Sequence, residues 1–168
     1  MATTASRKST KSSAKSSSGS TRKQDATALL RADHKEVSAL FAAYEKARST
    51  ATKRKLVTQI CIALTVHAQI EEEIFYPAFK RALNDKELVP EATVEHATLK
   101  DLIGQVEGVE PDGEMYDAKV KVLSEYVKHH VKEEQTEMFT KAKASSLDLA
   151  ELGARMAIRK DELMAQAA

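Results

Sequence analysis

Two His-x-x-x-Glu sequences, His67 to Glu71 and His130 to Glu134, place the strongest constraint on the fold of this chain. Residues four apart on an α-helix lie on one face, about one turn from each other. Each pair continues a stripe of apolar residues with helical spacing, so its imidazole and its carboxylate are predicted to point into the protein interior. We therefore expect helices that direct titratable side chains toward a common core.

Helical periodicity continues from about residue 25 to the C-terminal end of the chain. We predict helices at about 25–48, 53–82, 90–107, 115–143 and 147–166. Pro77 is expected to kink or end the second helix locally, and the apolar stripe of that helix is continued through Ile74 and Ala78. The predicted fold class is all-α, an up-down-up-down four-helix bundle with a short fifth C-terminal helix and a disordered N-terminal tail.

Residues 1–24 differ in composition from the rest of the chain. They contain six Lys or Arg and no acidic residue, whereas residues 25–168 carry 20 basic and 25 acidic residues. This Ser/Lys-rich segment has little to bury and is predicted to be a disordered basic tail. Contact with nucleic acid, an organellar transit peptide and a solubilising extension are open interpretations. The expected organisation is the tail, a bundle over 25–145 and a C-terminal helix over 146–168 that packs on it.

Several protein classes are excluded by what the sequence lacks. No apolar run approaches the roughly 20 residues of a membrane helix, and no secretory signal lies near Met1. Cys61 is the single cysteine, which excludes an internal disulfide and a Cys-based zinc site and fits a reducing compartment. There is no His-Glu-x-x-His helix, no Gly-rich phosphate loop and no ferritin-like Glu-x-x-His pair. We expect a cytoplasmic protein without a membrane partner.

Four of the five histidines are predicted to face one interior point. His34 and His96 fall on the apolar stripes of the first and third predicted helices, and the other two belong to the His-x-x-x-Glu pairs. With a rise of ~1.5 Å per residue, antiparallel packing brings these levels together near one end of the bundle. The predicted metal ligands are His34, His67, Glu71, His96, His130 and Glu134.

Each of these features also has an ordinary structural interpretation. A single buried histidine is commonly a hydrogen-bonded packing residue, and a single His-x-x-x-Glu pair on a helix surface is worth only ~0.2–0.5 kcal/mol. A metal site is favoured because all six side chains lie on otherwise apolar stripes, where burial without a common partner would be costly. At the surface, or in contact with the ligands, we place Glu72, Glu73, Glu95, His129, Glu133 and Glu137.

The donor set indicates the kind of metal. Nitrogen and oxygen donors without a thiolate suit iron, manganese or zinc. Six side chains exceed the four ligands of a tetrahedral zinc ion, yet they suit two six-coordinate ions that share bridging carboxylates. Such ions would keep coordination positions open for a diatomic ligand or a solvent oxygen.

Four segments resemble the hemerythrin-like HHE cation-binding domain: Asp33-His34, HAQIEEEIFYP (67–77), Glu95-His96 and HVKEEQTEMF (130–139). The resemblance covers roughly residues 25–143, and ELGARMAIRKDEL (151–163) is similar to the last helix of that family. The resemblance implies a four-helix bundle with a non-haem di-iron centre. It also implies that His34 and His67 bind one iron and His96 and His130 the other, with Glu71 and Glu134 as bridges.

The resemblance implies that the ferrous centre binds O₂ reversibly, but one position departs from the oxygen carriers. These place a further histidine four residues after the one on the third helix, where this chain has Lys100. We therefore expect a non-enzymatic di-iron protein that binds O₂ or handles iron by carriage, sensing or scavenging. The alternatives are a di-iron oxidase, a peroxide or nitric oxide reductase, and a metal-sensing interaction module tethered by its basic tail.

Overall fold

The structure, a computed structural model, describes residues 24–167. Its elements in chain order are α1 (Ala26–Lys46), α2 (Thr50–Ile70), the π-helical turn η1 (Glu71–Phe75), α3 (Tyr76–Leu83), α4 (Leu88–Gly104), α5 (Glu114–Glu133), the π-helical turn η2 (Glu134–Met138), α6 (Phe139–Ala144) and α7 (Leu149–Ala167). The described part contains no strand. The prediction for residues 1–23 of the tail lies outside the described residues.

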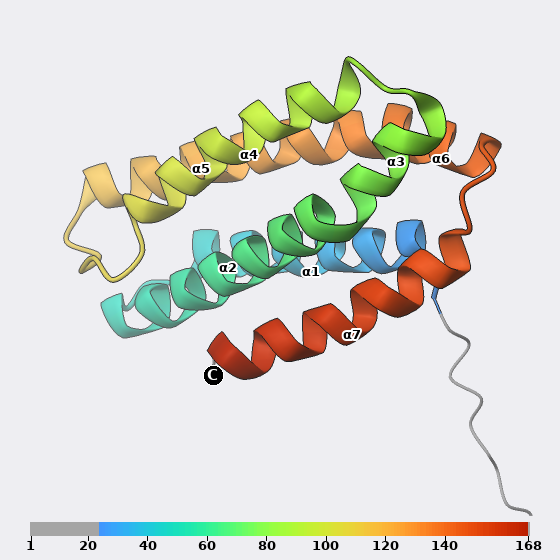
Figure 1. Cartoon of the computed structure of the whole chain (residues 1–168). Helices are drawn as coiled ribbons and strands as arrows, with labels where there is room; N and C mark the ends of the chain where they lie inside the picture. Colours follow the sequence, from blue (N-terminus) through green and yellow to red (C-terminus); the bar gives the residue numbers. More distant parts are fainter. Residues whose placement is uncertain (1–23, 168) are drawn as a thin grey trace, which may run out of the picture.

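Two long rods and two single helices form the bundle. The segments α2, η1 and α3 follow one another without a break, as do α5, η2 and α6. Helix α1 packs against α2, α4 packs against α5, and contacts between α1 and α5 and between α2 and α4 close the ring. Figure 1 shows these two antiparallel pairs lying one above the other. The predicted all-α, up-and-down four-helix bundle is confirmed.

Helix α7 lies outside the ring, along the face made by α1 and α2 (Figure 1). Its Gly153 sits so close to the start of α1 that an added Cβ would fall 2.7 Å from the backbone nitrogen of Ala26. A side chain at this position would therefore push the two helices apart. The fifth helix covers one side of the bundle and not its end.

The helix starts follow from local sequence. The Asp25 carboxylate accepts a hydrogen bond of 2.9 Å from the backbone N–H of Ala28, and the Ser49 hydroxyl accepts one of 3.2 Å from Thr52. Both side chains thereby satisfy free N–H groups in the first turn of α1 and of α2. None of the described helices is both long and apolar enough to cross a membrane.

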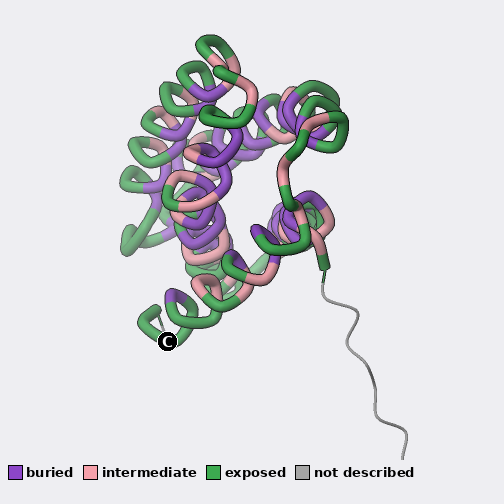
Figure 2. Tube along the Cα trace, turned by 45° about the vertical axis from the view of Figure 1, so that its right-hand side comes forward, coloured by how far each residue is buried: buried purple, intermediate pink, exposed green. Residues whose placement is uncertain are grey.

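The apolar core consists of two clusters, and Figure 2 shows buried residues along the inward faces of the helices. The first cluster contains Leu30, Ile70, Phe75, Phe79 and Phe139 and receives the buried face of α7. The second lies toward the other end and contains Phe41, Ile60, Leu64, Leu123 and Val127. The predicted ligands occupy the level between the two clusters, so apolar packing lies on both sides of them. This differs from the expected position near one end of the bundle.

The π-helical turn η1 explains one wrong detail of the predicted core. A π-helical turn contains one residue more than an α-helical turn, so the residues after it are displaced around the helix axis. Of the two residues predicted to continue the stripe, Ala78 is buried but Ile74 is only half-buried, whereas Phe75 and Phe79 are completely buried. Pro77 follows in the first turn of α3, where a missing N–H costs little. Because η2 forms without a proline, proline is not the common cause of the two turns.

Candidate metal centre

The four predicted histidines form two facing pairs inside the bundle. The Nε2 atoms of His34 on α1 and His67 on α2 are 3.1 Å apart, and those of His96 on α4 and His130 on α5 are 3.2 Å apart. In both pairs the ring centroids are 4.8 Å apart. All four imidazoles are buried, with at most 8% of their surface exposed. The two pairs therefore present similar nitrogen donors to the bundle interior.

Glu71 joins the two pairs. Its Oε1 lies 3.1 Å from His67 Nε2, and its Oε2 lies 3.3 Å from His96 Nε2. Two donors that each lie ~2.1 Å from one ion are about 3–3.4 Å apart, so these separations match those of ligands around shared cations. One carboxylate thus faces both histidine pairs, as expected for a bridging ligand.

Glu134 belongs more closely to the first pair. Its Oε2 lies 3.1 Å from His34 Nε2, and its ligand atoms group with those of His34, His67 and Glu71 within 4.8 Å of one another. The second group contains Glu71, His96 and His130. All six predicted ligands therefore meet at one level. That they bind a metal, and that Glu134 bridges two ions, stay predictions.

Both glutamates occupy the first position of a π-helical turn. The backbone N–H of Tyr76 donates to the carbonyl of Glu71, and that of Phe139 donates to the carbonyl of Glu134. These are the i to i+5 bonds of a π-helix, which is energetically poorer than an α-helix and is often found at functional sites. The same irregularity at both glutamates, and at no other described position, ties it to the buried carboxylates.

Each imidazole also has a partner at its other nitrogen. The Nδ1 atoms of His67, His96 and His130 lie 3.3 Å from Asp33, 2.9 Å from Glu72 and 2.7 Å from Glu95, respectively. His34 Nδ1 lies 2.8 Å from the side-chain amide of Gln135. A carboxylate at Nδ1 holds the proton there, so the lone pair of Nε2 faces the interior, as in metal-bound histidines.

These partners lead outward to charged groups at the surface. Lys160 on α7 donates to Asp33 at 2.6 Å, and Lys100 donates to both oxygens of Glu72 at 2.7 Å. Arg31 donates to the amide oxygen of Gln135 at 2.8 Å. The fourth partner, Glu95, instead faces His129, with 3.5 Å between its Oε1 and the imidazole Nε2. Three of the four Nδ1 partners are therefore bound by a lysine or arginine at the surface, and the fourth, Glu95, faces an imidazole.

The shifted pKa values of the buried groups show that the charges of the two glutamates oppose each other in the interior. Burial raises the pKa of Glu71, but the facing His67 and His96 outweigh it and hold the pKa well below its usual value. Burial and the neighbouring Glu71 raise the pKa of Glu134 well above its usual value. Burial and the charge of His67 lower the pKa of His34 to about 3. Two carboxylates at this depth therefore need a positive partner.

Three buried oxygens at the centre, Glu71 Oε1 and both oxygens of Glu134, have no hydrogen-bond partner. Buried carboxylate oxygens without partners are rare, because the loss of hydration is not offset. Imidazole lone pairs and free carboxylate oxygens that converge on one level suit divalent cations. The residues present therefore fit a metal centre.

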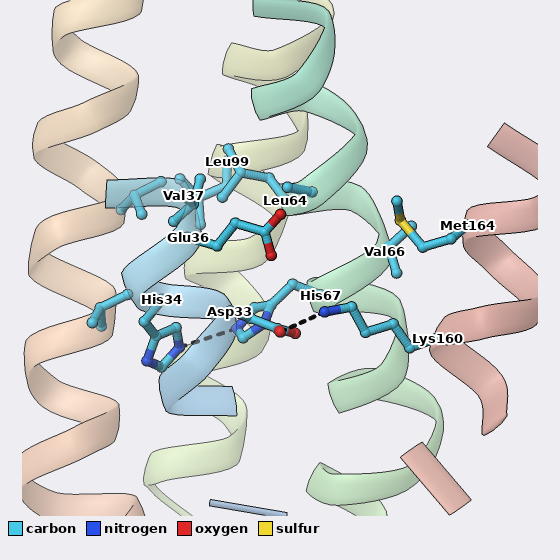
Figure 3. A pocket seen from close by; sticks show the side chains of 13 residues that line it. Asp33, His34, Glu36, Val37, Leu64, Val66, His67, Leu99, Lys160 and Met164 are labelled. Atoms are coloured by element: carbon cyan, nitrogen blue, oxygen red, sulfur yellow. Dashed lines mark hydrogen bonds and ion pairs between the residues drawn. The ribbon is translucent and has the colours of Figure 1, made fainter. Parts of the chain in front are cut away.

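An apolar cavity of about 170 Å³ adjoins the His34–His67 pair. Its apolar lining includes Val37, Leu64, Val66, Leu99, Val127 and Val131. Figure 3 shows that Lys160 and Met164 approach this cavity from α7, and that Lys160 pairs there with Asp33. The cavity connects the level of one histidine pair to the edge of α7, where Met164 is partly exposed.

Of the Nδ1 partners, Glu72 and Glu95 were among the residues expected at the surface or in contact with the ligands, whereas Asp33 and Gln135 were missed. A local signal for all four was present in the sequence. Asp33 and Glu95 each directly precede a ligand histidine, and Glu72 and Gln135 each directly follow a ligand glutamate. Each contacts a histidine on a different helix from its own ligand neighbour. The buried Tyr76, whose hydroxyl lies 3.2 Å from His96 Nε2, was also missed.

The positions expected outside the ligand set agree with the structure. The His129 side chain is 61% exposed and pairs with Glu133, which lies four residues further along α5. This is a third His-x-x-x-Glu spacing, at the surface. Lys100 turns to Glu72 and its side chain is about half exposed, so it takes no place among the buried donors.

Four helices that surround two imidazole pairs and two buried carboxylates define a helical-bundle protein with a cation-binding site. The family model of the hemerythrin HHE cation-binding domain matches residues 25–142. The chain belongs to this family.

Two known proteins are similar to this chain. A DNA nickase from Nostoc sp. is 27% identical over 111 residues, which are 66% of this chain and 31% of the nickase. The match therefore spans less than a third of the length of that relative. The crystal structure of a hemerythrin HHE cation-binding domain-containing protein from Mycobacterium kansasii superimposes with a TM-score of 0.75 at 22% identity. That match covers 85% of this chain and 89% of the other, and it shows a common fold.

Proposed function

We propose that the protein binds two iron ions in a non-haem di-iron centre and uses them to bind O₂ or to handle iron. The observation that carries the proposal is the Glu71 carboxylate, which faces one histidine of each pair. His34 and His67 would hold one ion and His96 and His130 the other. Glu71 would bridge the two ions, and Glu134 would add the second carboxylate.

The number of donors supports a six-coordinate ion such as iron over tetrahedral zinc, and the family resemblance favours iron. Four imidazoles and two carboxylates fill fewer positions than two six-coordinate ions offer. Tetrahedral zinc would need fewer donors than converge here. When bound, such a centre supplies reversible electron transfer to a small ligand.

The protein residues around the site orient the donors and control what reaches them. The carboxylates of Asp33, Glu72 and Glu95 hold three imidazoles with Nε2 directed inward. The apolar walls of the 170 Å³ cavity disfavour water and ions but accept a small apolar molecule. The Tyr76 hydroxyl lies within hydrogen-bonding distance of Glu71 and His96. These features favour O₂ or another diatomic molecule as the ligand.

The role we favour is non-enzymatic: carriage, sensing or scavenging. The same donors would serve a di-iron oxidase or a peroxide or nitric oxide reductase, so turnover decides between these functions. A third possibility is an interaction module in which the basic residues 1–24 bind nucleic acid. Retention on DNA that falls steeply with salt and depends on this segment would select it.

The test is anaerobic iron loading of the purified full chain, followed by metal counting and optical spectra with and without O₂. We expect about two iron ions per chain from the number of donors, and an absorption change that needs O₂ and reverses when O₂ is removed. Sustained consumption of O₂ or peroxide under a reductant would identify an enzyme. One ion or none per chain would contradict the di-iron proposal.

A further inference from the structure

The His130 side of the centre differs from the other three sides in what lies at the surface. The partners of His34, His67 and His96 are bound by Arg31, Lys160 and Lys100, so each of these approaches presents a positive charge. The partner of His130 is Glu95, and its outward oxygen faces the imidazole of His129. Of the four Nδ1 partners among the described residues, Glu95 is the one that faces a histidine at the surface where the others are bound by a lysine or arginine.

Glu95, His129 and Glu133 have the geometry of an exposed cation site. His129 Nε2 lies 3.5 Å from Glu95 Oε1 and 3.3 Å from Glu133 Oε1. These separations are close to the ~3.4 Å between two ligands of a tetrahedral ion at ~2.1 Å. The His129 side chain is 61% exposed, so water would complete the coordination and a bound ion would exchange readily.

A narrow crevice leads from this group toward the buried centre. It lies between α4 and the α5–η2 rod, has a volume of about 20 Å³ and is lined by Glu91, Glu95, Glu133, His130 and Glu134 among others. A volume of this size holds one water-sized particle. No lysine or arginine is among the described residues that line it.

The inner end of the crevice is lined by a carboxylate of the proposed buried centre. Glu134 is 3% exposed, and neither of its carboxylate oxygens has a hydrogen-bond partner. Glu133 and Glu134 are consecutive, and both line the crevice, one from the surface group and one from the buried centre. The crevice therefore has one carboxyl group at the surface and the next one in the chain at the buried centre.

We propose that Glu95, His129 and Glu133 form a surface site that captures a divalent cation and delivers it through the crevice to the buried centre. This inference rests on the proposed metal centre, because delivery needs a destination. The apolar cavity on the other side is a poor route for a hydrated ion. Its walls are mostly apolar, and its Asp33 is paired with Lys160. Cations would thus enter on the α4–α5 side, and small apolar ligands would enter beside α7.

The test is the double variant His129→Ala with Glu133→Gln, compared with Glu36→Gln. Glu36 is exposed and lines the apolar cavity, so its replacement removes a negative charge at the other opening. Anaerobic Fe²⁺ uptake is followed by stopped-flow absorbance, and release is followed with an excess of chelator. We expect the double variant to load about 10-fold more slowly, because a group of charges that concentrates an ion accelerates its association.

A site on the route changes both directions of transfer and not the final equilibrium. The double variant should therefore also release iron about 10-fold more slowly, with unchanged final iron content and unchanged Kd. Wild-type uptake and release rates in the double variant would overturn the inference, and so would slower uptake in Glu36→Gln alone.

A second measurement separates this inference from the proposed function. If the wild-type chain takes up no iron, the buried centre fails, whereas the surface site is still tested by Mn²⁺. Broadening of the His129 ring resonances by Mn²⁺, absent when Glu133 is replaced by Gln, would support a surface cation site. No broadening in the wild-type chain would overturn it.

Discussion

The segments α1–α3 and α4–α6 carry the same arrangement of side chains. In each, a histidine on the first helix pairs with one on the second, and a glutamate opens a π-helical turn. Asp33 and Glu95 take equivalent places before the first histidine, and Glu72 and Gln135 take equivalent places after the glutamate. The two halves differ at their edges: α7 packs on α1 and α2, and no described helix covers α4 and α5 in the same way. A repeated pair of helices can thus position the donors, while elements outside the repeat decide how each half is approached.

The largest expected effect is on iron content, and it should differ between variants of Glu71 and Glu134. Glu71 faces both histidine pairs, so Glu71→Ala should abolish binding of both ions, whereas Glu134→Ala should leave the His96–His130 ion in place. Loss of a ligand should exceed the roughly 10–100-fold cost of losing a hydrogen-bonded neighbour of a ligand. Metal counting after anaerobic iron loading measures this, with Glu73→Gln as the control because Glu73 pairs with Arg159 at the surface. Equal iron contents in the two alanine variants would show that the halves share the carboxylates evenly.

The metal-free protein should respond to pH in opposite ways at these two positions. Because the pKa of Glu134 is raised, the stability from this group is present below its unfolded pKa near 4.5 and is lost as the pH rises through the folded value. The lowered pKa of Glu71 has the reverse effect, with stability present above about 4.5 and lost at lower pH.

Glu134→Gln should therefore stabilise the metal-free chain at neutral pH, because the amide carries no negative charge beside Glu71. Glu71→Gln should destabilise it there. Urea unfolding in the presence of a chelator, at pH values on both sides of 4.5, measures the difference. The same sign for both variants at neutral pH would refute the contrast between the halves.

The smallest expected effect is on stability, and it concerns α7, which packs on the α1–α3 half. Lys160→Met removes the ion pair between α7 and Asp33, whose side chains are 28% and 11% exposed. A pair this close to the surface should contribute about 0.2–1 kcal/mol to the free energy of unfolding. A double-mutant cycle with Asp33→Asn isolates this interaction. A coupling free energy near zero would mean that packing alone, for example at Gly153, holds α7 in place.

Sequence periodicity was sufficient to predict the helices and to place the six predicted ligands on inward faces of the bundle. The predicted helix at 53–82 corresponds to the continuous rod α2–η1–α3, and that at 115–143 to α5–η2–α6. The six donors were found because polar residues on an apolar stripe stand out. The π-helical turns were not found, because one extra residue per turn shifts the stripe too little to be recognised in a short segment.

The contacts between helices could not be read from periodicity either. The Asp33 carboxylate contacts Nδ1 of His67 and not that of its neighbour His34. This depends on how α1 is rotated against α2. The third His-x-x-x-Glu spacing, at His129 and Glu133, was visible in the sequence but lay off the apolar stripe. Its connection to the buried His130 through Glu95 needs the packing of α4 on α5.

The layer of donors between the two apolar clusters has a consequence for the cooperativity of unfolding. Phe75, Phe79 and Phe139 pack on one side of this layer, and Phe41, Ile60 and Leu123 pack on the other. At the centre of the layer, three carboxylate oxygens of Glu71 and Glu134 lack hydrogen-bond partners, and Glu71 and Glu134 repel each other when no cation is bound. The two ends can then open as separate units, each with its own free energy. The two proposed ions, joined through Glu71, would link the α1–α2 pair to the α4–α5 pair, and metal binding would then turn two local transitions into a single global one.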